Sequence, residues 1–309
     1  AVDDHSGDVL ALLTPVQIAL SNGPMSRLTS RDIAYGSLLY RQDGRGQKAL
    51  RHLLDAYKRA ASRHSLFTEL RNLSSLSAIQ PLLGNSGFIY EDHLDFLVDL
   101  SQPEDVLWQR MSKSARKHIR RAQKHEDLAV VEAGTSKQLS EIYSLLRMTY
   151  DHARIPLADF SLFQALFEVL RPRQMAQFFV VYYRDMPIAG SVELLFNRTM
   201  YGFYGGTDRQ FTNLYPTELL QWRLFQWGQK HGYRVYDFGG AGKPDEEYGV
   251  RDFKAKFGGD LVNYGRNVCV HAPRLLEVSK RGYAVYRRLL AALENTRSLM
   301  RQTQPRLNA

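Results

Sequence analysis

The sequence predicts an α+β (α/β) protein built from two copies of one order of strands and helices, followed by a helical C-terminal tail. Three observations support this fold class. Amphipathic helices alternate with short strands along the chain, three strands follow one another closely between residues 177 and 205, and the element order of the second half partly recurs in the first. We therefore expect domains at residues 1–125 and 126–270 and a tail at 271–309.

The length and composition are those of a globular protein with about two domains. The 309 residues are 44% hydrophobic, and the net charge of +9 with a pI near 9.5 favours polyanionic partners such as nucleic acid, phosphorylated small molecules or anionic lipid surfaces. The single cysteine, Cys269, excludes an intrachain disulfide, and no CxxC or HExxH spacing indicates a metal site. A cytoplasmic, metal-free protein is the simplest expectation.

The first half shows strands and helices in alternation. Helical spacing of Leu50, Leu54 and Tyr57 predicts its main helix. The predicted elements are a strand or strand pair at Val9–Ala19, a strand at Ile33–Tyr40, a helix at Gln47–Ser62, a strand at Leu66–Leu70, a helical piece near Leu76–Leu83 and a strand at His93–Leu100.

Residues 113–124 form a predicted helix with an unusual density of cations and no acid. Its apolar side is Ala115, Ile119 and Ala122. The six cations are Lys113, Arg116, Lys117, Arg120, Arg121 and Lys124. A solvated linking helix is one interpretation, but such a helix normally includes i, i+4 acid–base pairs. The absence of acids therefore favours contact with phosphates, and we expect this helix to join the two domains.

The second half has the more complete element order. Pro216 marks the first turn of one helix, and His231-Gly232 marks its end. The predicted elements are a strand at Leu128–Glu132, helices at Leu139–Tyr150 and Phe160–Leu170, strands at Gln177–Tyr183, Ile188–Phe196 and Thr199–Gly205, a helix from Pro216, a strand at Arg234–Phe238 and a final strand at Val262–Val270. The three central strands should form an antiparallel meander.

A glycine-rich stretch after residue 238 is the main candidate site. Gly239, Gly240 and Gly242 follow a predicted strand and allow a sharp turn or a close approach to a ligand. Basic and aromatic residues then follow at Phe253, Lys254, Lys256 and Phe257. Ligands in open α/β sheets bind beyond the carboxyl ends of strands, so these residues together indicate a site. An ordinary glycine-rich connection beside a solvated basic helix end is the alternative.

The element order of the second half resembles the GNAT acyl-CoA N-acyltransferase fold, and the first half resembles a second copy that lacks its beginning. The equivalence of the copies predicts about 50 residues before Ala1. Two tandem GNAT-like domains resemble the Fem family, whose members transfer an amino acid from aminoacyl-tRNA onto an amine of the peptidoglycan precursor. The resemblance rests on LVDLSQPEDVLWQRMSKSARKHIRRAQK, FYGGTDRQFTNLYPTELLQW and YDFGGAGKPDEEYGVRDFKAKFGG.

The resemblance implies roles for the candidate residues. By motif position Phe253-Lys254 lies at the acyl transfer centre, and Lys254 is the expected donor to the oxyanion that forms on the ester carbonyl. Asp237 is expected to orient the amine or accept its proton, or else to cap a loop. Tyr204, Tyr215, Gly239, Gly240 and Lys256 are the candidate substrate contacts. A tRNA donor would place its phosphates on the cationic helix and its terminal adenine on Phe253.

Two other functions remain open at this stage. Residues 41–46 read RQDGRG, and Arg41, Gly44 and Gly46 fit the loop that holds the coenzyme A pyrophosphate in GNAT enzymes, so an acyl-CoA N-acyltransferase is one alternative. A simple strand-to-helix turn explains the same residues. The second alternative is a non-catalytic module that binds RNA or an anionic membrane surface. The enzyme interpretation expects no tightly bound cofactor, only aminoacyl-tRNA or acyl-CoA as co-substrate.

Overall fold

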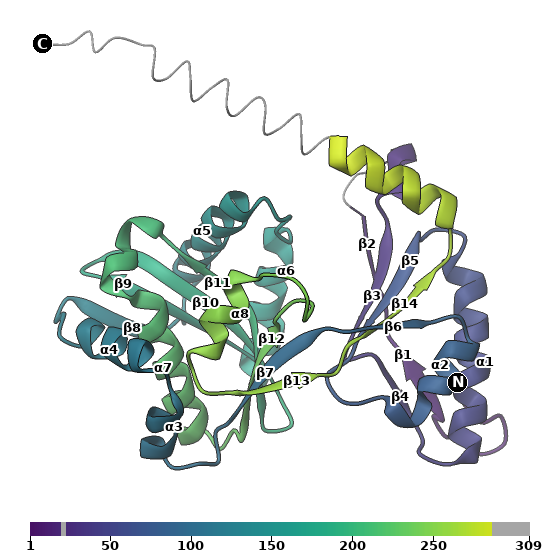
Figure 1. The fold of residues 1–309 in the computed structure, drawn as a ribbon, viewed down its shortest axis with the longest axis horizontal. Helices are drawn as coiled ribbons and strands as arrows, with labels where there is room; N and C mark the ends of the chain where they lie inside the picture. The colour runs from purple at the N-terminus through teal and green to yellow at the C-terminus, as the bar shows by residue number, and fades with distance from the viewer. Residues whose placement is uncertain (20–22, 286–309) are drawn as a thin grey trace, which may run out of the picture. The chain divides into compact units, whose positions relative to one another are not determined.

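The computed structural model describes residues 1–19 and 23–285 (Figure 1). The chain divides into two compact units. The first consists of Ala1–Glu91 and the chain from Tyr264 onward, and the second of Asp92–Asn263. The predicted ranges 1–125, 126–270 and 271–309 divide the chain at other places, because the chain enters the second unit before the basic helix and returns to the first for its last strand.

The first unit contains a mixed five-stranded sheet and a separate two-stranded sheet. Its strands are β1 (Ala11–Leu13), β2 (Val16–Ile18), β3 (Arg31–Tyr35), β4 (Leu38–Tyr40), β5 (Phe67–Arg71), β6 (Ile89–Glu91) and β14 (Arg266–Val270). Its helices are η1 (Gly23–Leu28), α1 (Gly44–Ala61), η2 (Ser77–Ile79), α2 (Gln80–Asn85) and the helical residues 273–285. The five-stranded sheet has the order β2-β3-β5-β14-β6, and β1 pairs separately with β4.

The core of the first unit lies between the five-stranded sheet and α1. Leu50 and Leu54 of α1 are fully buried against Ala34, Leu70 and Cys269 from three neighbouring strands. These sheet residues alternate with side chains that point to the opposite face, as the two-residue period of a strand requires. The predicted amphipathic helix at Gln47–Ser62 is confirmed and begins three residues earlier.

The second unit contains a longer sheet with helices on both faces. Its strands are β7 (Leu94–Asp99), β8 (Leu128–Glu132), β9 (Ala176–Tyr183), β10 (Met186–Phe196), β11 (Thr199–Thr207), β12 (Val235–Gly240) and β13 (Asp260–Asn263). Its helices are α3 (Glu104–Arg110), α4 (Lys113–Ala122), α5 (Ser136–Ala153), α6 (Phe160–Ala165), η3 (Leu166–Leu170), η4 (Arg171–Arg173), η5 (Arg209–Leu214), α7 (Pro216–Lys230) and α8 (Gly249–Ala255).

The strand order β13-β7-β12-β11-β10-β9-β8 explains why the sheet opens at its centre. Strands β9, β10 and β11 form the predicted antiparallel meander, whereas β11 and β12 are parallel and are connected through α7. Their ladder ends at the pair Tyr201 and Asp237, although β11 continues to Thr207. The carboxyl end of β12 is therefore the position at which a parallel pair separates, which is where open α/β sheets bind ligands.

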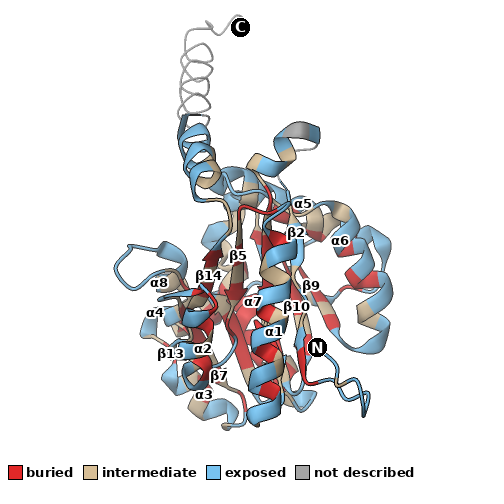
Figure 2. Ribbon diagram, turned by 90° about the vertical axis from the view of Figure 1, so that its right-hand side faces the viewer, coloured by how far each residue is buried: buried red, intermediate tan, exposed pale blue. Residues whose placement is uncertain are grey.

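Two hydrophobic clusters hold helices on opposite faces of this sheet. α3, α4 and α7 pack on one face around Phe225 and Ile119, and α5 and α6 pack on the other around Ile142 and Phe163. Figure 2 shows buried residues along the strands and exposed residues on the outer faces of the helices. The basic helix α4 therefore belongs to the second unit and does not link two domains, since its buried Ala115, Ile119 and Ala122 pack within that unit.

Two predicted strands need correction. Val262–Val270 is two strands in two different sheets, because Gly265 adopts a φ of 66° between them and its position leaves no room for a Cβ beside the Tyr90 ring. Ile33–Tyr40 is divided by a turn at Gly36 and Ser37, both with positive φ. Val9–Ala19 contains two strands divided before Pro15, which is the second of the two forms predicted for it. The short strand β6 was not predicted, since its three residues are exposed and carry no hydrophobic pattern. The last predicted tail residues, 286–309, lie outside the described part of the chain.

Among residues 1–19 and 23–285, no helix combines the length and the apolar run that crossing a bilayer requires.

Candidate active site

The carboxyl end of β12 departs from regular sheet geometry. The ladder between β12 and β7 is irregular between Asp237 and Gly240. Gly239 lies within this stretch at a φ of 68°, a conformation that glycine adopts without strain, and its N–H donates to Asp237 Oδ1 at 2.7 Å. The glycines thus shape the strand end, as the sequence predicted, and they place three consecutive main-chain carbonyls toward one side chain.

That side chain is Lys254, near the end of α8. Its Nζ donates to the main-chain oxygens of Phe238, Gly239 and Gly240 at 2.6, 2.8 and 3.0 Å. An ammonium has three N–H donors, so all three are in use in this structure. Lys254 therefore holds the irregular strand end in place. Its ammonium can donate to a reacting oxyanion only if the oxyanion replaces one of the three carbonyl oxygens as acceptor.

Two buried acids accompany Lys254. Asp237 comes from β12 and is 3% exposed, while Asp95 comes from the neighbouring strand β7 and is 9% exposed. Burial raises the pKa of both carboxyls, and in Asp95 the negative charge of Asp237 and a hydrogen bond between the two acids raise the pKa further. Burial lowers the pKa of Lys254, against the opposing effect of the two acids.

These shifts bring three ionisable groups toward the same pH range. An acid with a raised pKa and a lysine with a lowered pKa both titrate nearer to neutral pH than usual. Buried groups with perturbed pKa values in a separated strand end are typical of catalytic sites. The arrangement is able to accept a proton on a carboxyl and to present a positive charge beside it.

The aromatic residue beside Lys254 is held by packing. Phe253 is partly buried against the hydrophobic cluster of α7 and contacts the ring of Phe257 at a centroid distance of 5.1 Å. Lys256 Nζ lies 5.9 Å from the Phe253 ring centroid, over the ring. The predicted substrate contacts Gly239, Gly240 and Lys256 are thus brought close to Phe253-Lys254.

The two candidate tyrosines lie in different places. Tyr204 packs among aromatic rings beneath α5 and α6, including Tyr150, Phe163 and Phe203 at centroid distances of 5.5, 4.9 and 4.6 Å. Tyr215 lies at the start of α7 and stacks on His118 of α4 at 3.9 Å. The structure therefore groups Tyr215 with the basic helix.

The basic helix presents its cations to solvent. Lys113, Lys117, Arg120, Arg121 and Lys124 are exposed and Arg116 is half-buried. None of these six cations forms an ion pair with an acid in the part of the chain that the structure describes. Arg121 donates to Tyr215 Oη at 3.2 Å, and Arg120 lies over the Trp108 ring at 5.4 Å. The surface keeps its positive charge uncompensated.

Known proteins resemble this chain in one domain and in fold. Residues 109–254 match the acetyltransferase (GNAT) domain family. The chain is 29% identical to the lipid II:glycine glycyltransferase of Staphylococcus saprophyticus over 75 residues, which cover 23% of this chain and 18% of that relative. The crystal structure of FemX is similar at a TM-score of 0.66 and 15% identity, with coverage of 90% of this chain and 89% of that one. Residues 109–254 therefore form a GNAT-type domain, and the chain as a whole resembles FemX in fold.

The likeness to a second solved structure supports the tandem fold. A tandem GNAT protein from the clavulanic acid biosynthesis pathway has a TM-score of 0.53 and 12% identity, with coverage of 86% of this chain and 80% of that one. The prediction of tandem GNAT-like folds is therefore confirmed. The chain spans 18% of the length of the glycyltransferases that it matches.

The candidate pyrophosphate loop, residues 41–46, leads into α1. Asp43 caps the helix by accepting from the Gly46 N–H at 2.8 Å, and Arg41 Nε donates to the same carboxylate at 2.6 Å. Gly46 is needed because a Cβ would lie 1.9 Å from the Arg41 carbonyl oxygen. The Asp43 carboxylate thus occupies the position at the N-terminus of α1 where a bound anion would lie. This geometry favours the simple strand-to-helix turn.

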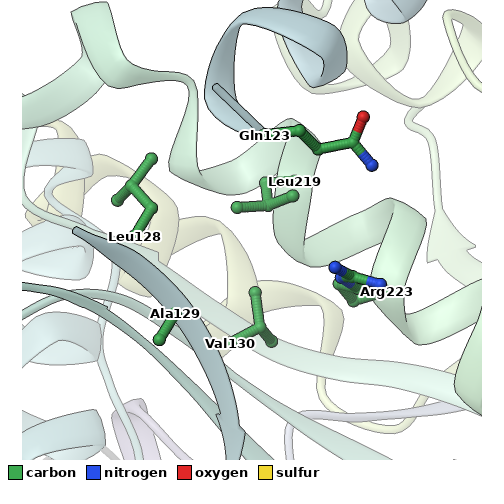
Figure 3. Close-up of a pocket in the computed structure, with 6 residues that line it drawn as sticks. All are labelled: Gln123, Leu128, Ala129, Val130, Leu219 and Arg223. Atoms are coloured by element: carbon green, nitrogen blue, oxygen red, sulfur yellow. The ribbon is translucent and has the colours of Figure 1, made fainter. Parts of the chain in front are cut away.

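A hollow lies between β8, α7 and the end of α4 in the second unit (Figure 3). It has a volume of about 550 Å³ and is lined by Gln123, Leu128, Ala129, Val130, Leu219 and Arg223. Its wall is β8, which is an edge strand four strands away from β12 in the sheet order. The hollow therefore contains none of the predicted site residues and lies apart from Lys254.

Two buried acids were missed from the sequence. Asp95 occupies a strand whose other residues are mostly apolar, and this polar exception in a buried run was the available signal. Glu193 is 1% exposed in β10 and accepts from Tyr236 Oη at 3.1 Å. The residues next to Glu193 in the sequence do not indicate this contact, because its partner Tyr236 lies on another strand, β12.

Proposed function

We propose that this chain is an N-acyltransferase that forms an amide bond, and that it moves an aminoacyl group from aminoacyl-tRNA to an amine of a peptidoglycan precursor or a similar peptide. The observation that carries the proposal is the buried group of Asp95, Asp237 and Lys254 at the open end of β12, in a domain of GNAT type. The acceptor class is supported by the glycyltransferases that the chain resembles.

The acids supply the proton acceptor in this proposal. An attacking amine must be neutral, and it must lose a proton as the amide forms. A carboxyl whose pKa is raised by burial is a better proton acceptor than an exposed one. Asp237 accepts the amine proton, and Asp95 shares it through the hydrogen bond between the two acids. As the amide C–N bond forms, the ester C–O bond to the tRNA ribose breaks, and the acid returns this proton to the departing ribose oxygen.

Lys254 supplies the positive charge. The longest of its three hydrogen bonds is the one to the Gly240 oxygen, at 3.0 Å. We propose that the developing oxyanion of the ester carbonyl replaces this acceptor, while the bonds to Phe238 and Gly239 keep the ammonium in position. A donor of this kind contributes about 3 kcal/mol to stabilisation of the transition state.

The basic surface of α4 is the proposed contact for the tRNA phosphates. Its cations lack acidic partners among the described residues, so neutralising phosphates there releases counterions without breaking ion pairs. The terminal adenine is proposed to stack near Phe253. A tRNA donor implies a cytoplasmic reaction, and a lipid-linked acceptor implies peripheral contact with an anionic membrane surface. No tightly bound cofactor is needed by this mechanism.

An acyl-CoA-dependent N-acyltransferase is the second candidate, and the match to the acetyltransferase domain family favours it. Two features weigh against coenzyme A. The residues before α7 form η5 and contain no glycine, and the α1 loop is capped by Asp43. A preference for acetyl-CoA over every charged tRNA tested would select this candidate.

The first experiment measures transfer by the Lys254→Ala variant. The full chain is incubated with a panel of charged tRNAs and a peptidoglycan precursor peptide, and amide product is followed by mass spectrometry. We expect Lys254→Ala to lower the rate of transfer by at least about 100-fold, as for removal of one oxyanion donor. Lys230→Ala, an exposed lysine at the end of α7, is the control. Equal rates in the two variants would remove Lys254 from the mechanism.

The second experiment tests the donor surface. Lys113→Glu with Lys117→Glu reverses two cations of α4, and Lys48→Glu with Arg51→Glu reverses two exposed cations of α1 with the same change in net charge. We expect the α4 variant to weaken tRNA binding and to flatten its salt dependence by about 1.5 in the slope of log K against log salt. Equal slopes in the two variants would show that only the overall charge matters.

A further inference from the structure

The hollow beside β8 takes no part in the proposed transfer, and its walls combine apolar and polar groups. Leu128 and Val130 point from β8 toward Leu219 of α7 (Figure 3). Gln123, at the C-terminal end of α4, and Arg223 of α7 add an amide and a guanidinium to the lining. The volume of about 550 Å³ lies within the range of small-molecule sites, which are mostly apolar with a few polar groups. The hollow therefore suits a flat group with apolar faces.

The main chain of β8 adds a hydrogen-bond donor and an acceptor. β8 is the last strand of its sheet, so one of its edges has no partner strand among the described residues. On the other edge, the Arg184 N–H donates to the Asp127 oxygen at 2.8 Å, and the Ala133 N–H donates to the Phe178 oxygen at 2.8 Å. Bonded and non-bonded pairs alternate along an antiparallel ladder, so the N–H and C=O of Val130 point away from β9. These two groups lie at the open edge of the sheet.

Positive charge borders the hollow. The end of α4 carries the exposed cations Arg120, Arg121 and Lys124. Arg223 donates to Gln226 at 3.1 Å and forms no ion pair with an acid within residues 1–19 and 23–285. The turn between α4 and β8 contains two acids, of which Asp127 pairs with Arg184 at 3.2 Å and Glu126 is exposed. The cations at this end of the unit outnumber the acids, which favours an anionic ligand.

A nucleotide of single-stranded RNA matches these features together. An unstacked base has two apolar faces and an edge of donors and acceptors, and proteins read that edge with hydrogen bonds. The faces fit the apolar walls, and the edge meets the main chain of Val130 and the amide of Gln123, a side chain that commonly pairs with bases. Arg223 supplies the donors for a phosphate. An extended acidic peptide would also add to the open edge, but the unpaired cations of α4 next to the hollow favour a polyanion.

We propose that the hollow between β8, α7 and α4 binds an unpaired nucleotide of an RNA strand whose phosphates lie along α4. The inference deepens the proposed function and rests on it, because it starts from the RNA contact at α4 and assigns a further nucleotide of that RNA to this unit. The nucleotide is a different one from the terminal adenine, since the hollow contains neither Phe253 nor Lys254.

The test follows the NMR signals of the Val130 amide and the Leu219 methyl groups in the full chain. The probes are hexaadenylate, hexacytidylate and hexauridylate, and sodium tripolyphosphate is the polyanion without bases. We expect saturable shifts of both signals with at least one hexaribonucleotide and none with tripolyphosphate. Equal shifts with tripolyphosphate, or no shift with any hexaribonucleotide, would overturn the proposal. So would shifts that appear only with phosphatidylglycerol vesicles, with an acidic hexapeptide, or on concentrating the protein alone.

Two substitutions separate the base from the phosphate. Gln123→Ala should weaken hexaribonucleotide binding by about three- to tenfold and leave the slope of log K against log salt unchanged, because it removes an uncharged contact. Arg223→Gln should weaken binding and also flatten the slope by about 0.7, the value for one phosphate of a single strand. Arg147→Gln, which removes an exposed arginine of α5, is the matched control and should change neither quantity. Equal effects of the two arginine substitutions would contradict the site.

Proline at position 130 tests the main-chain donor. Val130→Pro removes an N–H that takes no part in the ladder with β9, and edge strands tolerate proline at such positions. Val130→Ala shortens the same side chain and keeps the N–H. We expect the proline variant to bind the hexaribonucleotide about fivefold more weakly than the alanine variant. Equal affinities would remove the main chain of Val130 from the site, and if the proline variant does not fold, the Gln123→Ala result decides.

Failure of this site and failure of the proposed transfer give different results. Hexaribonucleotide binding in the hollow without transfer from any charged tRNA would leave the site standing and remove the transfer. Transfer that Gln123→Ala and Arg223→Gln leave unchanged, with no RNA-dependent shift of the Val130 amide, would remove the site and leave the transfer standing.

Discussion

At the scale of single residues, the second unit contains a carboxylic acid in its core. Glu193 is 1% exposed, and it accepts a hydrogen bond from the Tyr236 hydroxyl at 3.1 Å. Gly202 makes room for this contact, because a Cβ there would lie 2.8 Å from Tyr236 Oη. Burial raises the pKa of Glu193 from 4.5 to about 7. The acid is therefore protonated in the native state at mildly acidic pH.

This shift predicts a stability that falls as pH rises. An acid whose folded pKa lies above its unfolded value binds its proton more tightly in the folded state, so losing that proton favours unfolding. The free energy of unfolding should fall by up to about 3 kcal/mol between pH 4.5 and about 7 from this group. Glu193→Gln mimics the protonated acid and should remove this part of the pH dependence. Thermal unfolding measured at both ends of the window gives the comparison.

The control for this prediction is Glu126→Gln, since Glu126 is exposed just after α4. It should keep the wild-type dependence of Tm on pH. A Glu193→Gln protein that loses stability with pH as steeply as wild type would show that other groups cause the effect, among which Asp95 and Asp237 are the first to examine.

Residue by residue, the sequence located part of the candidate site. Lys254 and Asp237 were predicted because glycines and a basic-aromatic segment follow one strand in the sequence itself. Asp95 is separated from them by more than 100 positions and reaches them only through the ladder of β7 with β12. The three carbonyl contacts of Lys254 also depend on an irregular ladder that no periodicity reveals. Roles of these residues in transfer stay predictions.

At the scale of elements, the close packing of α5 on β11 depends on one of two adjacent glycines. A Cβ at Gly206 would lie 2.6 Å from the main chain of Leu145 in α5, whereas a Cβ at Gly205 would meet nothing within 4 Å. The helix α5 therefore approaches β11 closely at Gly206 and leaves open space at Gly205. Gly206 is buried and Gly205 is exposed.

Alanine at the two positions should have different effects. Gly206→Ala forces α5 away from the sheet and should destabilise the second unit by about 1–3 kcal/mol, the usual range for an overpacked core. Gly205→Ala adds a side chain in open space and should be neutral or slightly stabilising. Chemical denaturation of both variants measures the difference. Equal midpoints for the two variants would mean that the helix is free to shift.

Elements were predicted best where one face is buried along their whole length. The helix at Phe160–Leu170 and the three strands of the meander follow hydrophobic periods set by their own neighbours, and the structure confirms them. The region near Val262–Val270 failed because its two strands belong to different sheets while their residues read as one continuous run. Local patterns indicate that a segment is extended, but not which sheet it joins.

At the scale of the whole molecule, the two units differ in how the chain builds them. The second unit is one continuous segment, and both of its hydrophobic clusters lie between Leu94 and Phe257. The first unit needs β14 from the far end of the chain to join β5 and β6. The duplicated GNAT order was visible in the sequence. The return of β14 to the first unit was not, because it depends on which strands pair, and the sequence pattern does not show this.

This organisation predicts which fragments fold. A fragment of residues 92–263 contains every strand of its sheet and should show one cooperative thermal transition. A fragment of residues 126–270, the range predicted from sequence, lacks β7 and α3 and so loses the buried side chains of Phe96, Val98 and Leu107. Each such loss lowers the free energy of unfolding by about 2–5 kcal/mol. The sum is comparable to the whole free energy of unfolding of a typical domain, about 5–15 kcal/mol. Circular dichroism melts and amide NMR spectra of both fragments provide the measurement. A 126–270 fragment that melts as cooperatively as 92–263 would mean that β12 does not need β7 as its partner.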